Sequence, residues 1–377
     1  MEASDRGPGT VRASARAKIG RRAILGAGAA AATLMPSMGV AALAEKTEPA
    51  SAASKRSVRT IIDVHSHPSM PLYHDLIHAY DKMGSDARFP DRIAFPPGLP
   101  VWNSDQAIET MERNAIAAQV LSLPDVTLGL RGETARRHAR QINEALAEVV
   151  AEYPGRFAAF AVVPHDDMDS TLREIAYALD VLKLDGVCTS TNIRGTYIGD
   201  PIFDPWMAEL HRRRAVLFIH PTMPSVMNPA VPPVIEFSFD SARMIMNMVL
   251  SGAKRRFSDI KVISTHGGGA MPSLAHRLAI VQPLVSKGAV TTQQIEEDLR
   301  SFYYDLTSCM GEVNLAAAMR LTGSRKLLMG FDYPYAPETM MREEIERFFA
   351  FDGMADADRS AITTGNALAL FPRLATR

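Results

Sequence analysis

The sequence has few cysteines and almost no net charge. Two cysteines occur among 377 residues, and 41 basic and 42 acidic side chains leave a formal net charge of −1. Two cysteines are too few for the multi-disulfide framework of a small secreted domain, and we expect Cys188, inside a predicted strand, to be a buried small hydrophobe. No long block of one charge sign follows the N-terminal region, which argues against nucleic acid as a partner.

The N-terminal region has the composition of an export signal. Residues 1–22 are basic and end on the pair Arg21-Arg22, and an apolar run rich in alanine and glycine follows over 23–44. We predict a twin-arginine-type signal peptide over residues 1–44 and export to the periplasm. The alternative is a membrane anchor, since the run is about long enough to span a bilayer. Its weak apolarity and Pro36 favour the signal, so no stable anchor is expected after cleavage.

The remainder divides into a short linker and one large domain. Residues 45–57 are rich in alanine, serine and charge and predict a solvated linker. Residues 58–377 have the length of one large α/β barrel domain rather than two domains.

Short apolar runs alternate with helical patterns throughout this domain. The runs are nearly continuous rather than alternating, as expected for parallel strands covered by helices on the outside. The predicted fold class is therefore α/β, a (β/α)₈ barrel. A helix is predicted over Glu133 to Glu152, before the stop Tyr153-Pro154-Gly155. The predicted strands are 60–65, 117–123, 157–163, 186–190, 215–220, 260–266, 302–307 and 326–331.

The longest irregular connection covers residues 68–104 and follows the first strand. It is rich in proline, and loops at the C-terminal face of such a barrel carry function. We predict that this insertion forms a lid or a wall of the pocket.

Four histidines and one aspartate stand where apolar runs give way to loops. In a (β/α)₈ barrel, groups at the C-terminal ends of different strands converge on one mouth. Imidazoles and a carboxylate gathered there predict a divalent metal site with an acid/base group beside it. Each residue alone could instead be a polar group at a strand end whose hydrogen bonds are satisfied within the protein. The alternative that is not an enzyme is a catalytically inactive barrel that binds a ligand. These residues are His65, His67, His220, His266 and Asp332.

The roles of two of these residues follow from general chemistry. A metal with an open coordination position lowers the pKa of bound water toward neutrality. Asp332, if it contacts both metal and water, can take up the proton of that water. His266 could stabilise an anionic substrate or pass a proton to it.

As a set, the motifs around these residues resemble the amidohydrolase superfamily. The resemblance is to the amidohydrolase-2 branch, which includes aminocarboxymuconate-semialdehyde decarboxylase, and it covers nearly the whole domain. The matching segments are 61–67 (IIDVHSH), 153–157 (YPGRF), 218–221 (FIHP), 265–269 (THGGG), 330–334 (GFDYP) and 365–367 (GNA).

This resemblance implies a metal-dependent reaction on a small-molecule carboxylic acid. One divalent ion, usually zinc with manganese as an alternative, would be held by His65, His67, His220 and Asp332, with His266 as the separate catalytic residue. The fourth strand ends in 187–192 (VCTSTN) without the lysine of two-metal members, which implies one ion. The expected reaction is decarboxylation of an aromatic or unsaturated acid. The alternative is hydrolysis of a lactone, cyclic ester or amide.

A substrate carboxylate calls for arginine, whose planar guanidinium matches it in a bidentate way. Arg277 is the first candidate, because the resemblance implies that an arginine at this place reaches the site of a neighbouring subunit in a homodimer. The alternative for Arg277 is a structural ion pair at a helix surface. Arg194, after the fourth strand, is the second. Tyr333, Met223 and Met227 are further candidates to line the pocket.

Overall fold

The computed structural model describes residues 60–75, 101–124, 130–222 and 232–375. The chain divides into two compact units, Met1–Lys55 and Arg56–Arg377, and the first lies outside the described residues together with the predicted signal. The predicted linker and residues 76–100 of the predicted insertion also lie outside them. Within the described parts of the chain, no helix has both the length and the apolar composition to cross a bilayer.

All eight predicted strands are present, and each pairs in parallel with its neighbours in one sheet. Their order is β1-β2-β3-β4-β7-β8-β9-β10, which confirms the predicted (β/α)₈ barrel. A small antiparallel hairpin, β5 (Asn192–Ile193) and β6 (Thr196–Tyr197), follows β4. The barrel strands are β1 (Ile61–Ser66), β2 (Ile116–Leu121), β3 (Phe157–Ala161), β4 (Gly186–Ser190), β7 (Val216–His220), β8 (Lys261–Ser264), β9 (Tyr303–Asp305) and β10 (Leu327–Leu328).

The first and last strands meet at two single parallel bridges, Asp63 with Met329 and Ser66 with Tyr333. Further backbone hydrogen bonds run from the Val64 N–H to the Met329 carbonyl and from the His67 N–H to the Tyr333 carbonyl. These contacts join the two ends of the sheet and bring β1 beside the segment that follows β10.

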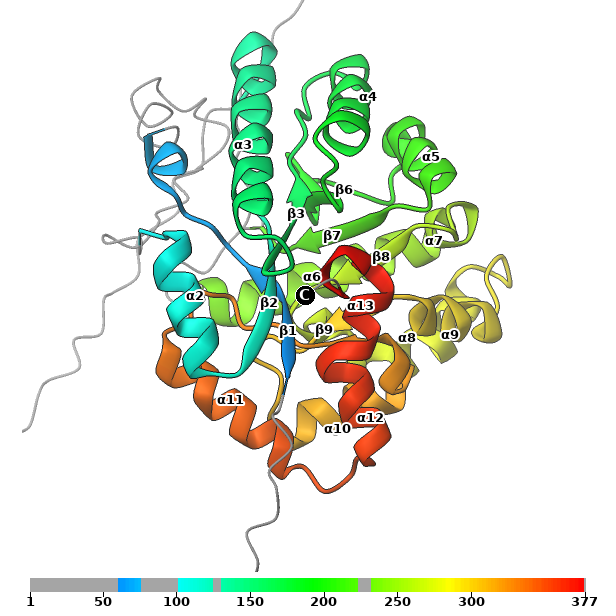
Figure 1. Ribbon diagram of the computed structural model, residues 1–377. Coiled ribbons are helices and arrows are strands. Elements are labelled where there is room, and N and C mark those ends of the chain that lie inside the picture. The colour runs from blue at the N-terminus through cyan, green and yellow to red at the C-terminus, as the bar shows by residue number, and fades with distance from the viewer. Residues whose placement is uncertain (1–59, 76–100, 125–129, 223–231, 376–377) are drawn as a thin grey trace, which may run out of the picture. The chain divides into compact units, whose positions relative to one another are not determined.

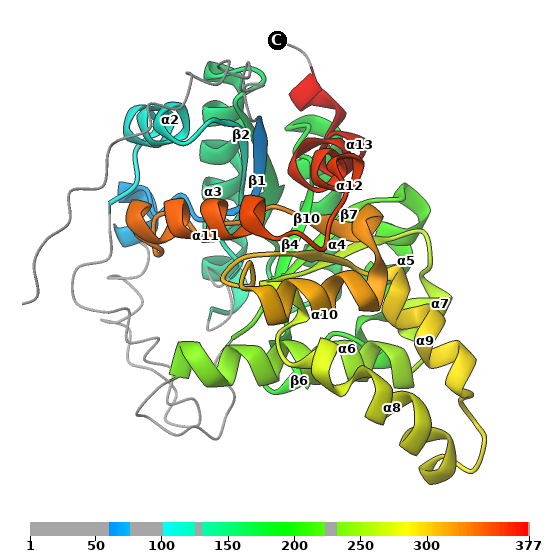
Figure 2. The ribbon, with the colours of Figure 1, turned by 90° about the horizontal axis from the view of Figure 1, so that it is seen from below.

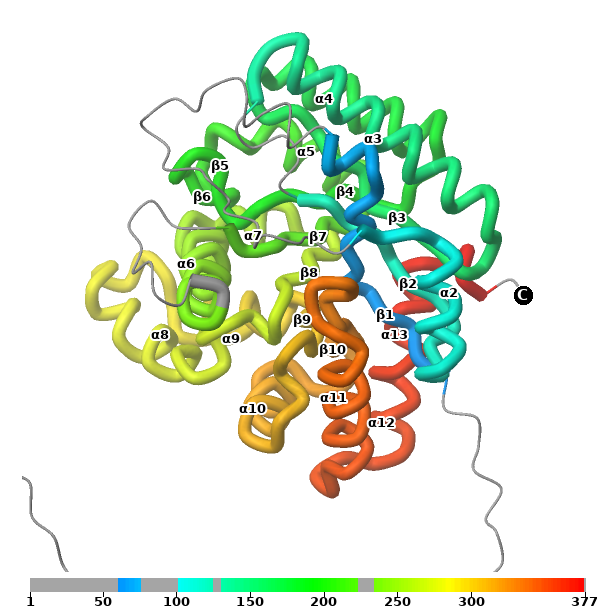
Figure 3. Tube along the Cα trace, turned by 90° about the vertical axis from the view of Figure 1, so that its left-hand side faces the viewer, coloured from blue at the N-terminus to red at the C-terminus, as the bar shows by residue number. Residues whose placement is uncertain are grey.

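Helices surround the strands, as Figure 3 shows for α3, α4, α6, α8, α10 and α11. The predicted helix is confirmed as α3, which buries one apolar face against the barrel and ends at Glu152. Helices α8 and α9 pack side by side (Figures 1 and 2). The helices are α2 (Ser104–Arg113), α3 (Gly132–Glu152), α4 (Met168–Ala176), α5 (Asp204–Arg213), α6 (Phe237–Leu250), α7 (Ala253–Arg256), α8 (Met271–Val285), α9 (Thr292–Ser301), α10 (Glu312–Thr322), α11 (Glu338–Ala350), α12 (Asp356–Ser360) and α13 (Asn366–Leu370).

Stacked aromatic rings fill the inside of the barrel. Phe160 of β3 and Phe218 of β7 stack with ring centroids 5.0 Å apart, and Phe371 after α13 meets the edge of Phe160 at 5.6 Å. All three side chains are fully buried. Such close packing makes the interior a rigid support for groups at the strand ends.

Candidate metal centre

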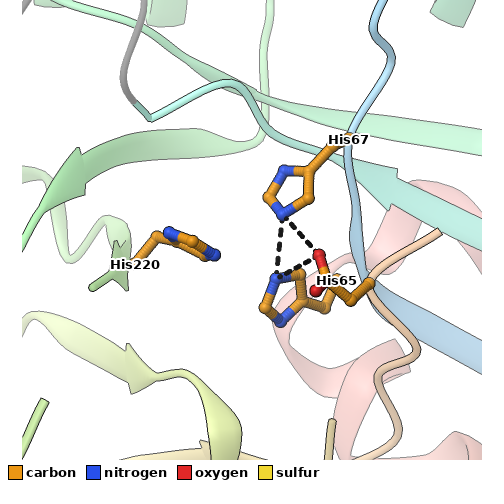
Figure 4. Close-up of side chains that lie close together, drawn as sticks. His65, His67 and His220 are labelled. Atoms are coloured by element: carbon orange, nitrogen blue, oxygen red, sulfur yellow. Dashed lines mark hydrogen bonds and ion pairs between the residues drawn. The ribbon is translucent and has the colours of Figure 1, made fainter. Parts of the chain in front are cut away.

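Four of the predicted residues come together at the C-terminal mouth of the barrel. One ligand atom from each of His65, His67, His220 and Asp332 lies within 4.8 Å of all the others. Among the described residues this is the one group of at least three such side chains that could hold a metal ion. Figure 4 shows the three imidazoles pointing toward one another. His65 and His67 lie on the same side of the chain because strand side chains alternate.

Each of these imidazoles has its Nδ1 atom beside an oxygen acceptor. His65 Nδ1 lies 3.1 Å from Asp305 Oδ2, His67 Nδ1 lies 2.9 Å from the Ser122 carbonyl, and His220 Nδ1 lies 2.7 Å from the Pro221 carbonyl. An acceptor at Nδ1 favours the tautomer with the proton on that atom. The Nε2 lone pairs of all three rings are then available for a metal ion.

The carboxylate of the cluster is placed by an unusual backbone conformation. Asp332 has a φ of 60°, in the left-handed region that non-glycine residues seldom adopt, and its N–H donates to the His65 carbonyl at 2.9 Å. Its Oδ1 atom lies 3.0 Å from His67 Nε2 and 3.6 Å from His65 Nε2. This placement brings a fourth ligand, distant in the sequence, to His65 of β1 and to His67 directly after it.

The donor set fits a divalent ion. Three imidazole nitrogens and one carboxylate oxygen are ligands that zinc accepts in a tetrahedral arrangement. His65 Nε2 and His67 Nε2 are 3.0 Å apart, close to the roughly 3 Å that separates two nitrogens bound to one ion at a bond length of about 2.1 Å. Asp332 Oδ1 is buried and has no hydrogen-bond donor among the described residues. An ion would satisfy that oxygen and relieve the crowding of nitrogen lone pairs.

The charge states of the cluster also suit a metal. Burial lowers the pKa of His220 well below its ordinary value, and His67, His65 and His266 add to the effect, so His220 is neutral as a ligand must be. Burial alone would raise the pKa of Asp332, but the adjacent His67, His65 and His266 outweigh it and hold that pKa far below its usual range. Asp332 is therefore ionised.

His266 lies beside the cluster without belonging to it. Its ring centroid is 5.0 Å from that of His65 and 5.5 Å from that of His220. The Nε2 atom is buried and has no hydrogen-bond partner in the described part of the chain. Burial, together with the nearby His65, lowers the pKa of His266 to about 4. A neutral imidazole with an unpartnered nitrogen can bind or move a proton on a bound molecule.

Asp305, at the end of β9, is a site residue that the sequence analysis missed. It is fully buried, and besides His65 it contacts the backbone of the catalytic candidate, since its Oδ1 atom accepts the His266 N–H at 3.0 Å. Burial would raise the pKa of this carboxyl, but His65 and His266 outweigh it and lower the pKa. The available signal was an acidic residue inside the apolar run of a predicted strand.

Two aromatic rings stand next to the imidazoles. Phe237, at the start of α6, lies with its centroid 5.7 Å from His220, and Tyr335 lies 5.3 Å from His67. Tyr333, one of the pocket candidates, is partly buried against the hydrophobic core, and its backbone carbonyl accepts the His67 N–H; that its side chain lines the pocket stays a prediction. The other two pocket candidates, Met223 and Met227, lie outside the described residues.

The two predicted arginines lie on separate elements, Arg194 in a turn and Arg277 on a helix. Arg194 lies in the turn between β5 and β6 with a φ of 52°, and donates to the Leu130 carbonyl at 2.9 Å. Arg277 is exposed on α8 and makes no ion pair with any described residue.

Comparisons with known proteins agree with this geometry. The model of the family described as "Amidohydrolase" matches residues 62–373. A decarboxylase of Penicillium terrestre, macB, is 33% identical over 336 residues, covering 83% of this chain and 95% of its own. The 6-methylsalicylic acid decarboxylase of Penicillium expansum is 30% identical, covering 83% and 96%.

A solved structure is similar in fold. It is that of 5-carboxyvanillate decarboxylase from Novosphingobium aromaticivorans, complexed with manganese and 4-hydroxy-3-methoxy-5-nitrobenzoic acid. The TM-score is 0.72 at 20% identity, with 83% of this chain and 96% of that chain covered. The family match spans the barrel from β1 to the C-terminal helices and includes every residue of the cluster, so the chain belongs to the amidohydrolase family and is an enzyme of that family.

Proposed function

We propose that this enzyme is a metal-dependent decarboxylase of a small aromatic carboxylic acid. The observation that carries the proposal is the cluster of three imidazoles and one carboxylate, beside which His266 Nε2 lies buried without a partner. The relatives add the substrate class, because two of them are named for 6-methylsalicylic acid and 5-carboxyvanillate, both aromatic acids. Phe237 and Tyr335 beside the imidazoles suit a flat ring.

The proposed cofactor is one divalent ion per chain, held by His65, His67, His220 and Asp332. When bound, such an ion acts as a Lewis acid that orients the substrate and stabilises negative charge. We favour zinc because nitrogen-rich donor sets suit it, whereas the solved relative contains manganese. Elemental analysis of purified protein, prepared without added metal, would distinguish the two ions.

The residues of the chain would supply and guide one proton. In decarboxylation the bond between the ring carbon and the carboxylate breaks, and a new bond from that carbon to a proton replaces it. Asp332 is ionised and can take a proton from water and pass it to the carbon, and the hydroxide left behind combines with the released CO₂ to give bicarbonate. His266 is neutral at neutral pH and can hold the substrate through a hydrogen bond at Nε2.

The test is a screen for CO₂ release over hydroxybenzoates and related unsaturated acids, run on protein of measured metal content. CO₂ release that requires the metal would support the proposal and rank the substrates. A protein that holds one ion, releases no CO₂ and opens lactones, cyclic esters or amides would be a hydrolase instead. A protein that retains no metal would favour a barrel that only binds.

We propose that the enzyme acts as a homodimer in which Arg277 contacts the substrate bound to the partner subunit. Arg277 is exposed and makes no ion pair within the described part of the chain, and its helix α8 exposes apolar side chains that a partner would cover, among them Ile280, Leu284 and Val285. Arg194, in the turn after β5, is the second candidate for the substrate carboxylate.

The matched experiment compares Arg277→Gln with Arg320→Gln, since Arg320 on α10 is also exposed and makes no ion pair with the residues that the structure describes. Loss of a charged hydrogen bond of about 1.5–3 kcal/mol corresponds to a KM raised by about ten- to a hundredfold in Arg277→Gln. Arg320→Gln should behave as the unchanged protein. Equal effects, or a monomer in sedimentation analysis, would contradict the assignment.

We also propose export to the periplasm through the twin-arginine signal over residues 1–44, with no stable membrane anchor afterwards. The basic segment, the pair Arg21-Arg22 and the apolar run support this proposal. Replacing both arginines by lysine should leave the protein in the cytoplasm, and mass spectrometry should locate the N-terminus of the exported protein near residue 45. An unprocessed protein in the membrane fraction would instead indicate an anchor.

A further inference from the structure

The carboxylate of Asp305 contacts both halves of the site. Its Oδ2 atom lies 3.1 Å from Nδ1 of His65, a proposed ligand. Its Oδ1 atom accepts two backbone N–H groups, from His266 at 3.0 Å and from Thr307 at 3.1 Å. Asp305 is fully buried, so water does not compete for these contacts. One side chain therefore touches the ring of a ligand and the backbone of the acid/base candidate.

The two carboxylate oxygens of Asp305 have different partners, and this difference fixes the tautomer of His65. Oδ1 is already occupied by two donors, and an ionised carboxylate offers only acceptors. Oδ2 therefore requires a proton on His65 Nδ1, which leaves the Nε2 lone pair directed toward His67 Nε2 and Asp332 Oδ1. Thr307 Oγ1 also lies 3.0 Å from His65 Nδ1, but a hydroxyl can donate or accept and so cannot select a tautomer by itself.

The contact between the His65 ring and Asp305 lies in a tightly packed region. A Cβ atom on Gly330 would collide with the Thr307 hydroxyl and with His65 Cβ, so only glycine at position 330 allows the ring to lie against Asp305 and Thr307. His266 itself has a φ of 52°, and its N–H bond to Asp305 holds that backbone conformation.

We propose that Asp305 is a positioning residue that selects the metal-binding tautomer of His65 and at the same time fixes the backbone of His266. Metal affinity and the position of the acid/base group would thus depend on one carboxylate. This inference rests on the proposed metal site, and it extends that proposal to a residue that touches neither the metal nor the substrate.

The test compares two isosteric changes of buried carboxylates near His65. In Asp305→Asn, the amide oxygen keeps the two backbone N–H donors, and the amide NH₂ then faces His65 Nδ1. That NH₂ group demands an acceptor at Nδ1, so the proton moves to Nε2 and blocks the metal. Removal of an outer-shell partner of this kind weakens metal binding by about ten- to a hundredfold.

Asp63→Asn is the matched control. Asp63 is equally buried and accepts the His65 backbone N–H at 3.0 Å, but it does not contact the ring. Its other oxygen accepts from Gln119 Nε2, and Gln119 Oε1 has no hydrogen-bond partner among the described residues, so a flip of the Gln119 amide would accommodate the new NH₂. We expect Asp63→Asn to bind metal as the unchanged protein does.

Metal affinity is measured for the full chain by competition with a chelator, with zinc and with manganese. A dissociation constant raised at least tenfold in Asp305→Asn, with Asp63→Asn unchanged, supports the proposal. Equal affinities in all three proteins, or equal losses in both variants, overturn it. If the unchanged protein binds no metal, the proposed function has failed. If the unchanged protein and Asp305→Asn both bind metal with the same affinity, only this inference is refuted.

A second measurement requires no stable variant. Nitrogen-15 NMR of the metal-free, unchanged protein, at a pH where the imidazoles are neutral, distinguishes the two tautomers of each ring. The His65 signal, assigned by its loss in His65→Gln, should show the proton on Nδ1. A proton on Nε2 of His65 would overturn the proposal even if Asp305→Asn does not fold, because a purely structural role of Asp305 would not set the tautomer.

Discussion

The inside of the barrel has two levels, which differ in whether their buried polar atoms have hydrogen-bond partners. At the mouth level, Asp332 Oδ1 and His266 Nε2 are buried polar atoms without a hydrogen-bond partner among the described residues. One step deeper along β1, at the inner level, both oxygens of Asp63 are occupied by donors, two of them the backbone N–H groups of His65 and Phe331. The stacked rings of Phe160 and Phe218 also belong to the inner level, and Phe218 meets the edge of the His65 ring with centroids 5.2 Å apart.

The two buried carboxylates show what the difference means. Neighbouring histidines hold the pKa of Asp332 far below its usual range despite burial, whereas burial raises the pKa of Asp63 to about 7. Polar groups that are satisfied within the protein stabilise the fold, and those that are left open are available to a ligand. We therefore expect changes at the mouth level to affect function and changes at the inner level to affect stability.

The largest effect is expected for His65→Ala. Loss of one ligand should reduce bound metal from about one ion per chain toward none, and loss of several kcal/mol of Lewis-acid stabilisation should lower kcat at least about a thousandfold. Elemental analysis and CO₂ release measure both. Full activity without metal would exclude the proposed role of the cluster.

His266→Ala should separate metal binding from turnover. The protein should keep its metal, because His266 lies outside the four-residue cluster, while kcat falls by about a hundred- to ten-thousandfold. Metal content and kcat are measured for this variant and for His65→Ala, and only His65→Ala should lose both. If His266→Ala lost its metal as readily, the division of roles at the mouth level would be wrong.

At the inner level, Phe160→Ala should affect stability rather than chemistry. Removing a fully buried ring that contacts Phe218 and Phe371 should cost about 3–5 kcal/mol in the free energy of unfolding. Denaturant unfolding of the metal-free protein measures the loss, and Phe160→Leu should lose less. Below the unfolding transition, metal content should be unchanged. A drop in metal affinity with unchanged stability would show that the levels are not independent.

The smallest effect is expected for Asp63→Asn, and it depends on pH. The pKa of Asp63 is raised from 3.8 to about 7, so the folded state binds this proton more tightly than the unfolded chain. The resulting stability is complete below about pH 4 and is lost as the pH rises through about 7. Above pH 7 the variant should be more stable by about 2 kcal/mol. Ionising the buried Asp63 costs the unchanged protein about 1.4 kcal/mol for each unit by which its pKa is raised, and the variant removes this cost. The weaker hydrogen bonds of the amide offset part of the gain.

Unfolding curves of both proteins between pH 4 and pH 8 test this prediction. The difference in the free energy of unfolding should grow with pH over that interval. A difference that is constant with pH would mean that Asp63 keeps an ordinary pKa.

Much of the fold and of the cluster could be predicted from the sequence because both depend on local patterns. Continuous apolar runs identified all eight strands, and a polar residue at the end of a run identified His220 and His266. The barrel topology then brings strand ends together whatever their separation in the chain. The predicted mouth therefore formed from residues as distant in sequence as His65 and Asp332.

Contacts that depend on side-chain direction were not predictable. Asp305 and Tyr335 contact the histidines through packing between different segments, which no spacing reveals. His138 lies on the buried face of α3 at 4% exposure. Burial lowers its pKa, so a neutral ring can take the place of an apolar side chain there.

The junction between the first and last strands sets an order of events in biosynthesis. His65 and His67 leave the ribosome early, whereas Asp332 and the bridges Asp63–Met329 and Ser66–Tyr333 belong to the last part of the nascent chain. A nascent or truncated chain that lacks this part has only the histidines and no closed barrel to align them. The complete site can therefore form only after Asp332 and the segment that follows β10 have been synthesised.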